Sequence, residues 1–249
     1  MSRADAVERQ SGLSHAKRAL LQMRIQQRNA APALTIPPRG SEGPAPLSFA
    51  QQRLWFLQQL DPEGTHYNEM ALLRMSGGVD ADALERSLAE VFRRHEVLRT
   101  TYRVVDGEPA QVVGPPPARP LAVVELEELP EAERGAALRE RLREEGERRF
   151  DLEGGFPLRA TLFRLGGGEH VLALAIHHIV TDGWSTGILM RELAALYEAF
   201  RRGDPSPLPP LPVQYADYAV WQRGRLSGAA LERHLAYWTE HLRGAPALL

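Results

Sequence analysis

The sequence predicts an α/β fold in which helices flank a mixed β-sheet. Segments with the apolar spacing of helices alternate with short apolar segments along most of the 249-residue chain, as they do where helices pack on a sheet. The segment EHVLALAIHHIV, residues 169–180, is apolar enough to be a strand at the centre of that sheet. A composition of 43% hydrophobic and 25% charged residues is ordinary for a globular protein with a core of its own.

Residues 1–45 are predicted to form an N-terminal helix and a linker. Residues 13–28 can form a short basic helix capped by Ser14, which is either a simple terminal helix or a docking helix that contacts another protein. Residues 29–46 are rich in proline and glycine, a composition that is typical of linkers. The folded domain is therefore expected to start near Pro46.

Local patterns predict the first half of the domain element by element. Ser48 and Gln51 have the spacing of a capping box at the start of a helix, and Asp106 with Gly107 forms a favoured hairpin turn. The expected elements are a helix over 47–60, a strand over 67–77, a helix over 80–100, a hairpin over 101–113 and a strand over 121–126.

The second half of the domain continues this alternation. Three consecutive glycines separate two apolar strands, and a proline-stiffened loop separates two of the later helices. The expected elements are a charged helix over 131–150, strands over 157–165 and 169–180, a helix over 184–200, the extended loop 203–212, and helices around 215–223 and 230–242.

The composition excludes several classes of protein. The net charge of −2 gives no reason to expect nucleic acid or an anionic membrane as a partner, and no apolar run approaches the roughly 18 residues that span a bilayer. Because the N-terminus lacks an apolar signal core, the expected location is the cytoplasm. The chain has no cysteine, which removes thiol nucleophiles, disulfides and thiolate metal sites.

The candidate site is the stretch HHIVTDG, residues 177–183, at the exit of the expected central strand. A metal site is disfavoured because neighbouring side chains of a strand point to opposite faces, so that His177 and His178 cannot readily bind one ion. A serine hydrolase is disfavoured because the sequence has no G-x-S-x-G turn. In the structural interpretation Asp182 simply caps the following helix, whereas the functional interpretation is a site at the end of a central strand.

Four motifs give the chain a resemblance to a known family. HHIVTDG matches the HHxxxDG signature of condensation domains in nonribosomal peptide synthetases. The segments SFAQQRLWFL (48–57), RHEVLRTTY (94–102) and YADYAVWQ (215–222) resemble three further motifs of that family, in the expected order. Together the motifs extend the resemblance from residue 46 to about residue 245.

The resemblance implies a fold of two chloramphenicol-acetyltransferase-like lobes that face each other across a V-shaped cleft. Residues 46–228 correspond to the N-terminal lobe, and residues 229–249 to a helix that leads toward a C-terminal lobe missing from this chain. The implied partners are donor and acceptor carrier domains, whose phosphopantetheine arms deliver an acyl thioester and an amine that become an amide. The resemblance implies no cofactor and no metal bound by the chain itself.

The resemblance also implies roles for single residues. His178 matches the family's active-site histidine and is expected to act as a base or to position the amine, since a neutral imidazole can accept a proton near neutral pH. His177 is expected to pack on the other face as a structural residue. Asp182 is expected to be held by Arg99 in a partly buried ion pair, so that losing either partner damages folding more than chemistry. Gly183 is expected to keep the passage for pantetheine open.

Two residues that follow the motif also match the family pattern. Trp184 is expected to pack against the fold, and Ser185 to take part in starting the next helix. Neither is expected to act on a substrate.

Alternatives to a condensation domain remain open. An epimerization domain shares the histidine pair, and a coenzyme A-dependent acyltransferase is the nearest free-standing enzyme of the same superfamily. In a different class, the chain is a non-catalytic docking or recruitment module that contacts an upstream synthetase through residues 13–28. The intact His178 argues against this last alternative, and the missing lobe argues for it in this chain.

Overall fold

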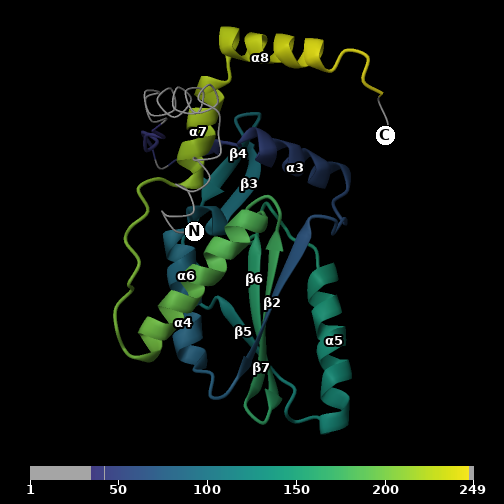
Figure 1. Ribbon diagram of the computed structural model, residues 1–249, viewed down its shortest axis with the longest axis vertical. Helices are drawn as coiled ribbons and strands as arrows, with labels where there is room; N and C mark the ends of the chain where they lie inside the picture. Colours follow the sequence, from purple (N-terminus) through teal and green to yellow (C-terminus); the bar gives the residue numbers. More distant parts are fainter. Residues whose placement is uncertain (1–34, 42, 247–249) are drawn as a thin grey trace, which may run out of the picture. The chain divides into compact units, whose positions relative to one another are not determined.

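A four-stranded mixed sheet lies at the centre of the fold (Figure 1). The computed structural model describes residues 35–41 and 43–246, so the helix expected over 13–28 lies outside the described residues. β7 runs antiparallel to both of its neighbours, β2 and β6, while β5 runs parallel to β6, which makes the sheet mixed as predicted. The strand order is β2 (Asn68–Ser76), β7 (Glu169–His177), β6 (Leu158–Gly166) and β5 (Leu121–Glu125).

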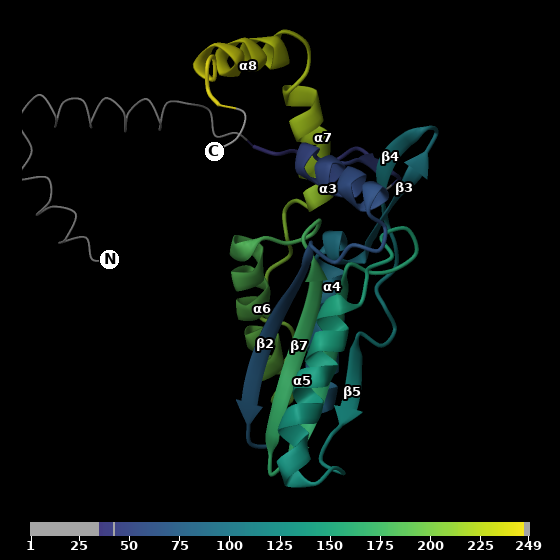
Figure 2. The ribbon, with the colours of Figure 1, turned by 90° about the vertical axis from the view of Figure 1, so that its right-hand side faces the viewer.

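Helices cover both faces of this sheet. α4 (Ala81–Arg94) and α6 (Gly183–Arg201) lie on one face, and α5 (Glu131–Glu147) lies on the other (Figures 1 and 2). β7 is buried from Val171 to His177 because it is sandwiched between these layers. Side chains alternate along a strand, so Leu172, Leu174 and Ile176 join the core with α4 and α6, while Val171 and Ala173 join the core with α5.

A smaller antiparallel sheet carries the predicted hairpin. Its order is β1 (Ala45–Pro46), β4 (Glu108–Val113) and β3 (Thr100–Val105). The turn between β3 and β4 places Asp106 at φ 51° and Gly107 at φ 83°. Two positive φ values in a two-residue turn match the right-handed twist of the strands that it joins. The predicted turn is confirmed.

The helix predicted over 80–100 ends earlier than expected. α4 stops at Arg94, His95 has an extended backbone, and the 3-10 helix η1 (Glu96–Arg99) follows. The side chains of Arg94 and His95 both reach Glu192 on α6. Consecutive residues of a continuous helix point about 100° apart, so the extended backbone at His95 is what allows both side chains to reach one carboxylate.

α3 (Phe49–Leu60) begins with the predicted capping box. Ser48 Oγ accepts a hydrogen bond from the backbone N–H of Gln51 at 3.1 Å, and the Gln51 side chain accepts one from the N–H of Ser48 at 3.0 Å. The buried Gln51 side chain also donates to the hydroxyl of Tyr102 on β3 at 3.1 Å. The cap therefore ties α3 to the small sheet as well as starting the helix.

Part of the expected linker is fixed to the folded unit, which starts at Pro37. The Arg39 guanidinium lies 2.8 Å from the carboxylate of Glu96 on η1 and 3.1 Å from that of Asp217 on α7 (Tyr215–Arg225). All three side chains are largely buried, so these pairs are screened less by salt than surface pairs. The domain boundary near Pro46 stays a prediction.

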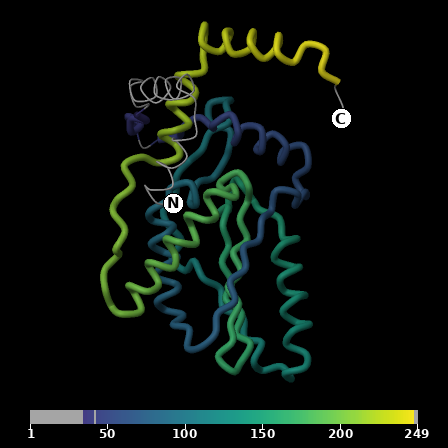
Figure 3. The backbone as a smooth tube through the Cα atoms, in the orientation of Figure 1, coloured from purple at the N-terminus to yellow at the C-terminus, as the bar shows by residue number. Residues whose placement is uncertain are grey.

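The chain after α6 returns toward the end of β7 and continues into two helices. The segment 203–212 forms neither helix nor strand, as predicted for a proline-rich loop, and Figure 3 traces it from α6 to α7. α8 (Gly228–His241) buries none of its residues, which leaves Leu235 and Trp238 at the surface. Among the described residues, no helix combines the length and the apolar character that crossing a membrane requires.

Candidate functional site

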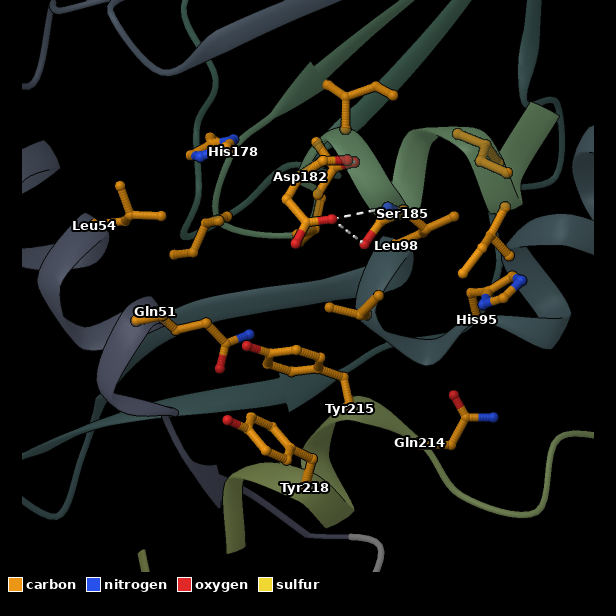
Figure 4. A pocket seen from close by; sticks show the side chains of 18 of the residues that line it. Gln51, Leu54, His95, Leu98, His178, Asp182, Ser185, Gln214, Tyr215 and Tyr218 are labelled. Carbon is orange, nitrogen blue, oxygen red and sulfur yellow. Dashed lines mark hydrogen bonds between the residues drawn. The ribbon is translucent and has the colours of Figure 1, made fainter. Parts of the chain in front are cut away.

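A cavity of about 550 Å³ lies beyond the end of β7. Its walls come from α3, η1, the start of α6, the start of α7 and the segment between β7 and α6 (Figure 4). A concave, largely apolar space with a few converging polar groups is the usual form of a small-molecule site. The polar side chains around it include Gln51, His95, His178, Asp182, Ser185, Glu192, Gln214, Tyr215 and Tyr218.

His178 is the histidine of the pair that lines this cavity. Its backbone N–H bonds to the carbonyl of Tyr67 at 2.8 Å, which extends the pairing of β7 with β2 by one residue. Its side chain is 37% exposed, and Nδ1 lies 2.7 Å from Oε1 of Glu69 on β2. The two atoms are not aligned as a hydrogen bond, and Nδ1 is shielded from solvent. The imidazole is thus accessible, with its Nδ1 edge next to a carboxylate.

His177 lies in different surroundings and is only 1% exposed. Its ring centroid is 5.9 Å from that of Phe150 and 6.3 Å from that of Tyr67. Nδ1 accepts a hydrogen bond from the backbone N–H of Ile179 at 3.1 Å. Burial, and secondly the neighbouring His178, lowers the pKa of His177 from 6.5 to about 4. A buried, neutral imidazole with aromatic neighbours has the features of a structural residue.

Asp182 is the N-cap of α6. One oxygen of its carboxylate accepts hydrogen bonds from the backbone N–H of Ser185 at 2.8 Å and from the Ser185 hydroxyl at 2.7 Å, drawn as dashed lines in Figure 4. The hydrogen bonds from the Ser185 side chain and backbone hold the pKa of Asp182 below its usual range. The carboxylate therefore stabilises the start of the helix next to the cavity.

The expected ion pair between Asp182 and Arg99 is wrong. Arg99 Nε donates to the carbonyl of Phe92 at 3.1 Å, and its guanidinium also donates to the carbonyl of Gly114. The nearest carboxylate to Arg99 is that of Glu96, at 3.9 Å. Arg99 thus joins the end of α4 to the end of β4 and is not available to Asp182.

Replacing Asp182 by alanine is expected to lower the free energy of unfolding by about 1 kcal/mol, the usual value of an N-cap. Because the carboxylate is exposed and caps a helix rather than filling a buried pair, the loss of about 3–5 kcal/mol that follows the breaking of a buried pair is not expected. Urea unfolding measures the difference. Asp182→Asn, an equally good cap, is the control, and a loss above about 3 kcal/mol in the alanine variant would contradict the cap role.

The residues that follow Asp182 differ in exposure. Gly183 is the first residue of α6, and a Cβ built there would meet no atom within 4 Å. Trp184 is 81% exposed, so the expectation that it packs against the fold is wrong for the described chain. Ser185 donates hydrogen bonds to Asp182 in the first turn of α6. It therefore takes part in starting the helix, as expected.

A charged cluster forms one wall of the cavity. Glu192 Oε2 lies 2.9 Å from Nε of Arg94 and 2.6 Å from Nε2 of His95. Burial alone would raise the pKa of Glu192, but the hydrogen bonds from Arg94 and His95 outweigh it and lower that pKa. The carboxylate is therefore ionised and matched by its neighbours, which leaves the cavity without an uncompensated charge on this wall.

Two carboxylates of this site, Glu69 and Glu192, were not predicted from the sequence. Each one carried a signal. Glu192 lies on the helical face that also presents Leu189 and Leu196 to the core. Glu69 shares its face of the strand predicted over 67–77 with the apolar residues Ala71, Leu73 and Met75. A carboxylate on an otherwise apolar face indicates a specific partner, because an unpaired buried charge is costly.

The described residues contain no group of three or more His, Asp or Glu side chains arranged to hold a metal ion. The Nδ1 atoms of the two adjacent histidines have different neighbours. His177 Nδ1 is bonded to the backbone of Ile179, and His178 Nδ1 lies beside Glu69. His178 thus presents an accessible imidazole to the cavity.

The fold and the site together define a chloramphenicol-acetyltransferase-like protein with a histidine at the exit of its central strand. The family model of the condensation domain matches residues 41–249, and the chain belongs to this family. It is 44% identical over 247 residues to phosphinothricin tripeptide synthetase PhsC of Streptomyces viridochromogenes, covering 98% of this chain and 23% of that protein. It is 44% identical over 234 residues to malpinin synthetase of Mortierella alpina, covering 91% of this chain and 3% of that protein. The resemblance drawn from the four motifs is confirmed.

Solved structures confirm the expected fold. The first condensation domain of the CDA synthetase has a TM-score of 0.70 and 28% identity, covering 83% of this chain and 52% of that structure. The X-domain in its complex with OxyB from teicoplanin biosynthesis has a TM-score of 0.76 and 32% identity, covering 87% of this chain and 47% of that structure. The chain spans about half the length of these structures and less than a quarter of the two synthetases.

Proposed function

We propose that the protein containing this chain joins two carrier-bound substrates through an amide bond. The donor is an acyl or peptidyl thioester, and the acceptor is an aminoacyl group with a free amine. The observation that carries this proposal is the position of His178, which lines a cavity of about 550 Å³ at the exit of the central strand. Membership of the condensation-domain family supports acyl transfer in general.

The reaction needs a group that handles the proton of the amine. When the nitrogen attacks the thioester carbonyl, a C–N bond forms, the C–S bond breaks, the nitrogen loses a proton and the departing sulfur gains one. A neutral imidazole at the reacting nitrogen accepts that proton or holds the nitrogen in line. His95 also lines the cavity, but its side chain is less exposed than that of His178, at 21% against 37%, and it does not belong to the HHxxxDG motif. His178 is therefore assigned this task.

In this proposal the substrates arrive on the phosphopantetheine arms of donor and acceptor carrier domains, and the chain binds no cofactor of its own. Gly183 supports such an entry. It does not itself line the cavity, but it lies between Asp182 and Ser185, which do, and no atom lies within 4 Å of the place where its Cβ would be. In this proposal a residue without a side chain keeps the edge of the cavity clear for a narrow arm.

Gly183→Leu is expected to lower kcat/KM for loaded carriers about 10-fold, mainly through KM, because the side chain enters the opening without touching the reacting atoms. Its free energy of unfolding should stay within about 0.5 kcal/mol of the parent protein, since nothing lies within 4 Å of the added Cβ. Gly187→Ala is the control on the same helix, where a Cβ would meet only the Arg191 guanidinium at 3.5 Å. If the kinetic parameters of Gly183→Leu were unchanged, the proposal that Gly183 keeps a passage open for the phosphopantetheine arm would be contradicted.

The function is tested by reconstitution. The chain is extended to the length of the solved relatives, mixed with acyl-loaded and aminoacyl-loaded carrier proteins, and the acceptor carrier is analysed by mass spectrometry. Amide formation adds the mass of the acyl group to the aminoacyl acceptor, and the acyl group stays attached to the amino acid after the thioester to the carrier is cleaved. A folded, extended protein that yields no amide with any loaded pair contradicts the proposal.

A second candidate function is binding without catalysis. The similarity to the X-domain solved in complex with OxyB favours it, because that relative is seen holding another protein. The same reconstitution separates the two candidates. Absence of product together with tight binding of a partner synthetase would make recruitment the better assignment, whereas product that depends on His178 would not fit recruitment.

A further inference from the structure

The carboxylate of the HHIVTDG motif does not orient His178. Asp182 is engaged with Ser185 as the cap of α6. Within the part of the chain that the structure describes, the carboxylate at ion-pair distance from His178 belongs to Glu69, whose Oε1 lies 2.7 Å from Nδ1. The group beside the imidazole thus comes from another strand, about a hundred residues earlier in the sequence.

The register of β2 and β7 places Glu69 beside His178. Glu69 pairs with Ile176, and His178 follows Ile176 by two residues, which brings it to the same face at a diagonal position. Further along β2 this face carries Ala71 and Met75, which pack against the core. Glu69 interrupts an apolar row at the one point where the row meets the accessible imidazole.

The Nδ1 atom of His178 has an acceptor within reach, unlike the buried Nε2 of His177, which also lacks a hydrogen-bond partner. Nδ1 of His178 is shielded from solvent and forms no aligned hydrogen bond, and a buried polar nitrogen without a partner is unfavourable. The Glu69 oxygen is already at hydrogen-bonding distance, so a rotation of the ring or of the carboxylate completes the bond without moving the backbone. Since an ionised carboxylate only accepts hydrogen bonds, the bond requires the proton on Nδ1.

His177 has the opposite arrangement. Its Nδ1 accepts the backbone N–H of Ile179, so the proton of this neutral ring is on Nε2. Different partners therefore determine the tautomers of the two adjacent histidines. A backbone donor determines that of His177, and a carboxylate acceptor determines that of His178. His177 serves as an internal reference for the state of His178.

We propose that Glu69 is a positioning residue for His178. Its carboxylate accepts a hydrogen bond from Nδ1–H, fixes the plane of the ring and leaves the lone pair on Nε2, where an attacking amine can use it. This inference deepens the proposed function and rests on it for the catalytic consequence. The tautomer of His178 is a property of the chain alone, so it can be measured independently of any activity.

The first experiment measures the ring tautomers in the 249-residue chain. Nitrogen-15 NMR of histidine-labelled protein distinguishes a protonated ring nitrogen from a bare one, and His178→Gln and His177→Asn variants assign the two signals. In the unaltered chain His178 is expected to carry its proton on Nδ1, and His177 on Nε2. In Glu69→Ala, His178 is expected to lose its preference for Nδ1–H while His177 keeps its signal.

Two outcomes of this experiment would overturn the proposal. One is an Nε2–H tautomer for His178 in the unaltered chain, and the other is a His178 signal that Glu69→Ala leaves unchanged. Because neither outcome involves substrates, this experiment decides the role of Glu69 even if the proposed amide-forming activity fails its own test.

The second experiment measures kinetics in the extended protein. Glu69→Ala is expected to lower kcat about 10- to 100-fold, the range for a displaced catalytic group, with KM for the loaded carriers unchanged. Glu69→Gln, whose amide oxygen can still accept from Nδ1–H, is expected to retain more activity than Glu69→Ala. An increase in KM with unchanged kcat would instead make Glu69 a substrate-binding residue and would overturn the positioning role.

Glu169→Ala is the matched control for the loss of a carboxylate. Glu169 pairs with Arg74 at 2.9 Å across the same two strands, at the opposite end of β7 from the site. Its removal is expected to change neither the His178 tautomer nor kcat. A loss of activity equal to that of Glu69→Ala would show that the effect comes from the strands rather than from the position beside His178.

Discussion

Replacement of His178 by alanine is expected to lower the rate of amide formation in the extended protein by about 10²- to 10⁴-fold, the usual contribution of a positioned acid or base. The loss falls on kcat, because the imidazole meets the nitrogen only as it reacts. Folding is expected to be nearly unaffected. The side chain is 37% exposed and lies outside the main core cluster, so the free energy of unfolding should change by no more than about 1 kcal/mol.

The measurement is the single-turnover rate of product formation by mass spectrometry, beside a urea unfolding curve for each protein. His66→Ala is the control, since His66 is exposed, lies 3.7 Å from Asp61 and is not part of the cavity wall. It is expected to keep the full rate. If His178→Ala formed amide at more than about a tenth of the parent rate, His178 would be neither the base nor the positioning group.

The parts of the fold that depend on residues close to one another in sequence could be predicted from the sequence. The hairpin turn needs only Asp106 and Gly107 with their positive φ values, and the capping box needs only Ser48 and Gln51. β7 was predicted as a central strand because an uninterrupted apolar run is stable only where both faces are covered. Each of these signals lies within a few residues of the element that it predicts.

The partners of the charged residues could not be predicted in this way. Arg99 was expected to pair with Asp182, but carbonyl groups of Phe92 and Gly114 lie within reach of the guanidinium and take its hydrogen bonds. Which groups come within reach is decided by how α4, η1 and β4 meet, and no local pattern encodes this. The candidate site was found because its histidine and its capping aspartate are close in sequence, whereas Glu69 comes from a strand that is distant in sequence.

His177 is expected to make the protein sensitive to mild acid. Its pKa is lowered from 6.5 to about 4 by burial and by His178. At pH values above 6.5, the ordinary pKa of histidine, this ring is neutral in both the folded and the unfolded chain. In that range it therefore has no effect on how stability depends on pH. As the pH falls through 6.5 the unfolded chain takes up the proton and the folded chain does not. The free energy of unfolding therefore falls, by about 3 kcal/mol in total, until the folded ring is protonated as well near pH 4.

The test compares the chain with His177→Asn in urea unfolding at several values between about pH 7.5 and pH 4. The Asn side chain can still accept from the Ile179 backbone N–H but does not titrate. At the upper end the variant should be less stable by about 1–3 kcal/mol, because the ring no longer fills its site beside Phe150. Toward the lower end the parent chain should lose about 3 kcal/mol relative to the variant, so the difference disappears or changes sign. Groups common to both proteins titrate equally and cancel in the comparison. Two curves that stay parallel over the whole range would mean that His177 takes up its proton with the same pKa in the folded and the unfolded chain, which would contradict the lowered pKa and the assignment of His177 as a buried, neutral ring.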